Sequence, residues 1–141
     1  MKNQQLIAKL REKGFRVTPQ RLAICEFVLS SKKHPTVEQV YKVVQKEHPT
    51  ISLATVYQTL HLLAEIGMLQ ELGFSNGCSR YDPNNSPHIN IICKNCGKIQ
   101  DYESESVRKF LSQITEELKR TLIVQHLEIY TYCDQCEKSV T

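Results

Sequence analysis

The chain has 141 residues, 40% of them hydrophobic, and a formal net charge of +3. This length suits one ordinary core or two small lobes. No run of about eighteen apolar residues occurs, which excludes a membrane-spanning helix, and the first residues lack the pattern of a signal peptide. We therefore expect a cytoplasmic protein.

The charge is distributed unevenly. Residues 1–83 carry eleven Lys and Arg against seven Asp and Glu, whereas residues 84–141 carry seven against eight. A basic first half suits a polyanionic partner, such as nucleic acid.

Four helices are predicted in the first half. Thr18 followed by Pro19, Thr36 paired with Gln39, and Ser52 are all residues that favour the start of a helix. Apolar residues then recur at helical spacing, and Gly14 and Gly67 mark two of the ends. The expected helices span residues 3–13, 19–31, 37–46 and 53–66.

A hairpin is predicted directly after the last of these helices. The strand-like runs 68–74 and 78–81 flank the dipeptide Asn76-Gly77, which is typical of a tight turn between two strands. Helices joined by short turns and followed by a hairpin predict a winged helix-turn-helix. Residues 1–83 would therefore form a DNA-binding domain.

The outward face of residues 53–66 would be the recognition surface. Its side chains are small, polar or aromatic and include no acid, as a helix in the major groove requires. Tyr57 and His61 could equally be ordinary solvated positions. Phosphate contacts would be made by Lys13, Arg16, Gln20, Arg21 and Tyr57. The expected DNA-binding residues are Arg16, Gln20, Arg21, Ser52, Ala54, Thr55, Tyr57, Gln58 and His61.

A hinge rich in Pro and Asn at about 82–87 separates a second domain, residues 88–141. Strands are expected at 88–93, 98–102 and 122–132, with a helix at 107–118. Such a small mixed lobe could dimerise through its sheet. The inward residues of the helix would be Phe110, Leu111, Ile114 and Leu118. The fold class is thus α+β, with a winged-helix domain and an α/β dimerisation domain.

Four of the six cysteines form two C-x-x-C pairs, separated by the 36 residues 97–132. Two such turns complete a tetrahedral zinc site and would hold together a lobe with little core. Redox disulfides or an iron–sulfur cluster are the alternatives. Cys25 is expected to be a buried, inert thiol. The predicted structural Zn²⁺ ligands are Cys93, Cys96, Cys133 and Cys136.

A second cluster offers nitrogen and oxygen donors instead. His88 and Asn90 lie two apart on a strand and so share a face. A metal held by His34, Asp82, His88 and Asp101 would take ligands from both lobes and act as a switch. Such a site favours Fe²⁺ or Mn²⁺ over zinc. The alternative is that these are surface residues with no shared role.

Six short segments occur in this order along nearly the whole chain: Val17-Thr-Pro-Gln-Arg21, His34-Pro-Thr36, Ala54-Thr-Val-Tyr57, Ser79-Arg-Tyr-Asp82, Cys93-x-x-Cys96-Gly-Lys98 and His126-Leu-Glu-Ile-Tyr130. Together they resemble the ferric uptake regulator family of metal-dependent repressors.

The resemblance implies a homodimer that binds a palindromic operator, a structural zinc, and a regulatory metal at His34, Asp82, His88, Asn90 and Asp101. The aspartate at position 82 resembles the peroxide-sensing branch. Asn90 departs from the family, which usually has a histidine there. A further metal site of some relatives is not expected, because Arg108 stands where they carry a glutamate, and His126 would then be structural.

The expected function is a peroxide-responsive, metal-dependent repressor without enzymatic activity. A regulator of iron, manganese or zinc uptake that lacks peroxide chemistry is the first alternative. A metallohydrolase using the His/Asp cluster is more remote, because no general base is evident. A zinc-ribbon interaction module without DNA binding fits poorly with the winged-helix pattern and the basic first half.

Overall fold

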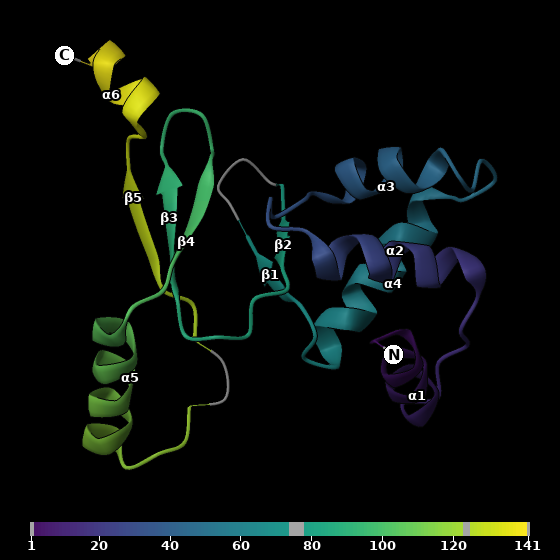
Figure 1. Ribbon diagram of the computed structural model, residues 1–141, viewed down its shortest axis with the longest axis horizontal. Helices are drawn as coiled ribbons and strands as arrows, with labels where there is room; N and C mark the ends of the chain where they lie inside the picture. Colours follow the sequence, from purple (N-terminus) through teal and green to yellow (C-terminus); the bar gives the residue numbers. More distant parts are fainter. Residues whose placement is uncertain (1, 74–77, 123–124, 141) are drawn as a thin grey trace. The chain divides into compact units, whose positions relative to one another are not determined.

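The computed structural model describes residues 2–73, 78–122 and 125–140 (Figure 1). The chain divides into two compact units, Met1–Asn85 and Ser86–Thr141. The boundary falls inside the segment expected to be the hinge. No helix of the described residues is long and apolar enough to cross a membrane.

The first unit contains the four expected helices: α1 (Lys2–Glu12), α2 (Pro19–Ser30), α3 (Val37–Gln45) and α4 (Leu53–Glu65). Their starts are set by local hydrogen bonds. The Thr18 hydroxyl accepts the Arg21 amide at 3.2 Å, and Thr36 and Gln39 form a reciprocal capping box. These bonds satisfy amides that have no partner inside the helix.

Two glycines end helices in the expected way. Gly14 after α1 and Gly67 after α4 have φ of +80° and +79°, a region that side chains with a Cβ rarely adopt. The helices enclose one apolar cluster, to which α1, α2, α3 and α4 all contribute. Its most deeply buried members include Ile24, Val28, Val40, Val56, Leu60 and Leu63.

The hairpin consists of β1 (Gln70–Leu72) and β2 (Arg80–Asp82), which pair antiparallel. In this register Glu71 lies opposite Tyr81. The predicted turn at 75–77 lies outside the described residues. Packed helices α2, α3 and α4 followed by this hairpin confirm the winged helix, and we call the hairpin the wing.

The second unit contains β3 (Ile89–Cys93), β4 (Ile99–Tyr102), α5 (Glu105–Leu118), β5 (Glu128–Thr131) and α6 (Asp134–Val140). The sheet order is β4-β3-β5, with β3 antiparallel to β4 and parallel to β5. Within this unit, Figure 1 shows α5 at one end of the sheet and α6 following β5 at the other.

Two expectations for this unit need correction, and one helix was not expected. The strand predicted at 122–132 is shorter, because the ladder with β3 covers only Glu128–Thr131. The helix predicted from 107 begins at Glu105, because the Ser104 hydroxyl caps it by accepting the Val107 amide. Helix α6 was not predicted.

The predicted inward face of α5 is only partly buried. Leu111 is buried, but Phe110 and Leu118 are 51% and 55% exposed, so their inward placement is wrong for a single copy of the chain. The physical reason is that α5 lies at one end of the sheet and not across its face (Figure 1), so few of its side chains are covered. Amphipathic spacing identifies an apolar face but not what covers it.

Candidate metal centres and nucleic-acid interface

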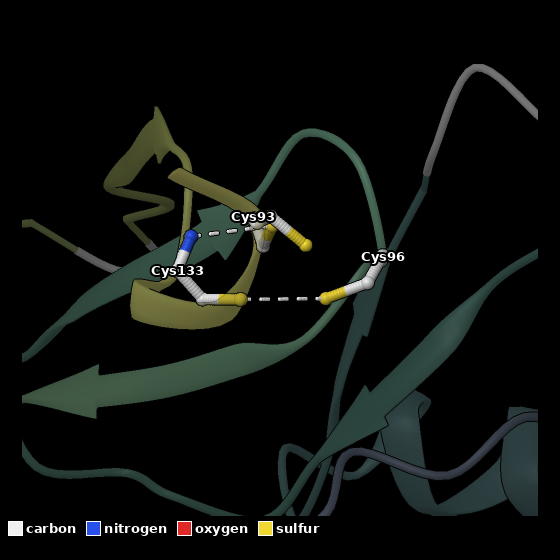
Figure 2. A group of neighbouring side chains, drawn as sticks. Cys93, Cys96 and Cys133 are labelled. Carbon is white, nitrogen blue, oxygen red and sulfur yellow. Dashed lines mark hydrogen bonds between the residues drawn. The ribbon is translucent and has the colours of Figure 1, made fainter. Parts of the chain in front are cut away.

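The four paired cysteines converge in the second unit. Cys93 ends β3, Cys96 lies in the following turn, and Cys133 and Cys136 lie before and within α6. Their four sulfurs lie within 4.8 Å of one another. Figure 2 shows three of these side chains directed toward one another, and the sulfurs of Cys96 and Cys133 are 3.8 Å apart. A tetrahedron with Zn–S bonds of about 2.3 Å has an edge of about 3.8 Å.

Local geometry brings the sulfurs together. Gly97, with φ of +78°, allows the turn after Cys96, and its amide donates to the Cys93 carbonyl at 2.9 Å. Cys133 and Cys136 are brought beside Cys93 and Cys96 because the Lys94 amide donates to the Thr131 carbonyl at 2.8 Å. Each turn therefore presents two sulfurs, as a closed zinc site needs.

The electrostatics of the cluster favour a bound cation. Hydrogen bonds from the backbone amides of Cys96 and Cys133 lower the pKa of the Cys93 thiol to about 6, which favours the thiolate form that binds metal. The Asn95 amide lowers the pKa of Cys136, but the neighbouring thiols and burial raise it, to about 11 in the balance. A metal ion would supply the positive charge that holds all four as thiolates.

One His/Asp pair lies in the first unit. His34 sits in the loop between α2 and α3, and Asp82 ends β2. Both side chains are buried, and His34 Nε2 lies 3.5 Å from Asp82 Oδ2. The other carboxylate oxygen accepts the Asn84 amide at 2.9 Å, which fixes the orientation of the carboxylate. We call His34 and Asp82 the first pair.

The second pair consists of His88 and Asp101 and lies in the second unit. His88 precedes β3, and its Nε2 lies 3.9 Å from Asp101 Oδ1 on β4. The Nδ1 of His88 lies 2.7 Å from the Ser86 carbonyl. A carbonyl can only accept, so Nδ1 must donate the proton. The Nε2 lone pair is then available to a metal, in the manner of many ligand histidines.

Asn90 lies beside the second pair. It is directly opposite Asp101 in the β3–β4 register and only 2% exposed. Among the described residues, its amide oxygen has no hydrogen-bond partner. A buried acceptor left unsatisfied is costly. A bound cation would remove that cost, and an amide oxygen suits a metal that prefers nitrogen and oxygen ligands.

The outward face of α4 has the expected form. Ala54, Tyr57, Gln58 and His61 are exposed and Thr55 is half-buried, while Val56, Leu60 and Leu63 are buried beneath them. The rings of Tyr57 and His61 stack with centroids 6.3 Å apart. His61 also lies 3.3 Å from Glu65. This face is free of acidic side chains until that last turn.

The other predicted DNA contacts lie in the same unit. Arg16 is exposed, and Arg21 donates to its carbonyl at 2.9 Å. Gln20 donates to the Thr50 hydroxyl at 3.3 Å. Ser52 caps α4 by accepting the Thr55 amide at 3.0 Å. The contacts of these side chains with DNA stay a prediction.

The remaining candidate residues have simpler surroundings. Cys25 is fully buried, and burial raises the pKa of its thiol to about 12, which fits the inert role expected of it. Arg108 is exposed and lies 3.7 Å from Glu105, and His126 is also exposed.

Sequence reasoning missed three supporting groups. They are the Ser86 carbonyl that orients His88, the Asn95 amide on Cys136, and Arg80, which bonds the loop around His34. Only Arg80 left a signal in the sequence, because it lies inside the segment Ser79-Arg-Tyr-Asp82 that carried the resemblance.

A winged helix, a four-cysteine centre and two His/Asp pairs define a metal-binding regulator of the winged-helix class. The model of the ferric uptake regulator family matches residues 12–130. The chain belongs to this family. It is therefore a transcriptional regulator and not an enzyme.

Individual relatives agree with this assignment. The chain is 36% identical to the peroxide-responsive repressor PerR of Staphylococcus aureus over 135 residues, which is 95% of this chain and 90% of that protein. A solved structure of the Campylobacter jejuni peroxide stress regulator is 30% identical, with a TM-score of 0.75 and coverage of 94% and 97%. The iron-containing ferric uptake regulator of Francisella tularensis is 29% identical, with a TM-score of 0.71 and coverage of 88% and 96%.

Proposed function

We propose that this protein is a metal-dependent transcriptional repressor that responds to peroxide. The observation that carries the proposal is that each unit contains a buried imidazole whose Nε2 lies close to an aspartate carboxylate, at 3.5 Å in the first pair and 3.9 Å in the second. The similarity to the Staphylococcus aureus repressor supports the peroxide response.

One Fe²⁺ or Mn²⁺ would take ligands from both pairs and from Asn90. Neither pair alone can fill the coordination of such an ion, which favours about six nitrogen and oxygen donors. A metal shared by the two units would select one arrangement of them, and the metal-free protein would lose it. When Fe²⁺ is bound, it supplies the reaction with peroxide that oxidises ligand imidazoles. His34 and His88 are the imidazoles that this chain presents.

The zinc centre would be structural and would stay filled in both states. Four thiolates leave no open coordination position for chemistry. Its role would be to hold the β3–β4 turn against the start of α6.

The partners would be a second copy of the chain and double-stranded operator DNA in the cytoplasm. The second unit exposes apolar side chains on α5 and around the sheet, and β5 is an edge strand among the described strands. Such a surface suits a homodimer. Two copies would place two α4 helices on the half-sites of a palindrome. The apolar residues are Tyr102, Phe110, Leu118, Ile129, Tyr130 and Tyr132.

The direct test compares operator binding by zinc-filled protein loaded with Fe²⁺ or with Mn²⁺, before and after dilute peroxide. The region upstream of its own gene is the operator to try. Both metal forms should bind, and only the iron form should lose DNA, with oxygen added to the peptides that carry His34 or His88. Metal-free protein that binds DNA as tightly as the metallated forms would contradict the proposal.

A second candidate function is a sensor of iron or manganese level without peroxide chemistry. Asn90 favours it, because an amide oxygen is a weaker, neutral donor and cannot be oxidised as an imidazole can. In the same experiment, this function would show release of DNA on metal removal and no effect of peroxide.

Asn90→His should raise the affinity for Mn²⁺ by about tenfold, because an imidazole replaces a weaker amide donor. Competition with a fluorescent metal indicator measures the change. Gln100→His is the matched control: it adds an imidazole at an exposed position of β4 next to Asp101, where side chains alternate between the faces of the sheet. If Asn90→His and the unchanged protein bound Mn²⁺ with equal affinity, Asn90 would not be a metal ligand.

A further inference from the structure

Arg80, on the wing, holds the loop that carries His34. Its guanidinium donates to two successive carbonyls, that of Lys33 at 2.8 Å and that of His34. One residue further along, the Tyr81 amide donates to the Pro35 carbonyl at 3.0 Å. Three consecutive loop carbonyls are thus bound by two consecutive residues of β2. All of these residues belong to the first unit.

The loop needs such support because of the backbone at His34. Its φ is +52°, the left-handed region that residues other than glycine adopt only at an energetic cost. His34 is also only 2% exposed. In this conformation its imidazole Nε2 faces Asp82, two residues after Arg80, at 3.5 Å. The distance between His34 and Asp82 therefore depends on the conformation of this loop.

We propose that Arg80 is the positioning residue of the regulatory site: its guanidinium holds His34 in the conformation that presents Nε2 to the metal beside Asp82. This inference rests on the proposed function. Arginine suits the task because its planar fork can donate to two neighbouring oxygens at once, whereas a lysine ammonium is a point charge. The free protein then has the first pair already formed, and metal binding does not have to order the loop.

Electrostatic repulsion and positioning predict opposite changes in metal affinity when Arg80 is removed. A guanidinium close to a site for a divalent cation repels that cation. If charge were its only influence, removing Arg80 would tighten metal binding. If Arg80 acts through the loop, removing it should weaken binding although a repulsive charge has gone.

The experiment is a double-mutant cycle on zinc-filled protein, with Mn²⁺ affinity read from the electron paramagnetic resonance of free Mn²⁺. The variants are Arg80→Met, His34→Ala and the two together. Arg80→Met should weaken Mn²⁺ binding by about tenfold or more, the size expected for charge-assisted hydrogen bonds. In the His34→Ala background the same change should cause no further loss, because the ligand that Arg80 positions is gone, and the removed positive charge should leave binding unchanged or slightly tighter. Arg80→Lys should bind with intermediate affinity.

Lys33→Met is the matched control, because it removes an exposed cation from the same loop but none of the bonds to its carbonyls. It should leave Mn²⁺ affinity unchanged or slightly raised. Zinc content and circular dichroism of each variant show that both units remain folded. Should Arg80→Met not fold, Arg80→Lys takes its place in the cycle.

The outcomes separate the inference from the function on which it rests. Weak binding by His34→Ala together with unchanged or tighter binding by Arg80→Met would refute the positioning role and leave the proposed function standing. A full additional loss from Arg80→Met in the His34→Ala background would also refute it. Unchanged Mn²⁺ affinity of His34→Ala would overturn the proposed ligand set, and the positioning role with it.

Discussion

Cys96→Ser should release the zinc and unfold the second unit. Among the described residues, this unit buries only six apolar side chains, two of which are the zinc cysteines Cys93 and Cys136, against fifteen in the first unit. So small a core cannot offset the cost of ordering the chain. Structural zinc contributes about 10–16 kcal/mol in small peptides, and a serine hydroxyl is not a thiolate ligand. Metal analysis, circular dichroism and size-exclusion chromatography should show loss of zinc, of strand signal and of the dimer.

Cys78→Ser is the control for this change. Cys78 is also an exposed cysteine, as Cys96 is, but it lies outside the cluster of four sulfurs. Its variant should keep one zinc per chain and the size of the unchanged protein. A Cys96→Ser variant that keeps stoichiometric zinc and the intact dimer would contradict the assignment of the four-cysteine centre.

Asp82→Asn should abolish metal-dependent operator binding while the metal-free protein stays folded. The amide keeps the shape of the carboxylate and can still accept the Asn84 amide, but it carries no negative charge to bind a cation. Loss of a residue that only supports a metal ligand lowers metal affinity by about 10- to 100-fold. Because Asp82 would itself be a ligand, we expect Mn²⁺ affinity to fall by more than this. Operator binding measured by fluorescence anisotropy across a Mn²⁺ titration gives the result directly.

Glu47→Gln is the matched control, since it removes one negative charge from an exposed position of the same unit. It should titrate with Mn²⁺ as the unchanged protein does. If Asp82→Asn still gained DNA affinity at the same Mn²⁺ concentration, the carboxylate of Asp82 would not be a ligand.

Helices α2, α3 and α4 were predictable because their starts depend on bonds between residues three apart. The hydroxyls of Thr18, Thr36 and Ser52 each accept an amide three residues later. Apolar periodicity then identifies the buried faces. The paired cysteines were predictable for a similar reason, since each C-x-x-C turn brings two sulfurs together locally.

Other features depended on contacts that local sequence does not encode. The strand β5 is short because its parallel pairing with β3 spans only Glu128–Thr131. Phe110 and Leu118 carry an apolar signal, but whether they are covered depends on which other elements pack against α5.

The sequence by itself determined the winged-helix order, the four cysteines proposed to bind zinc and the residue types of the proposed regulatory site, because these follow from spacing and donor chemistry. Only the tertiary structure decided how His34 is held. Its left-handed backbone and its bonds to Arg80, 46 residues away, arise when the wing packs onto the loop. No local pattern specifies that contact, because it depends on the path of the whole unit.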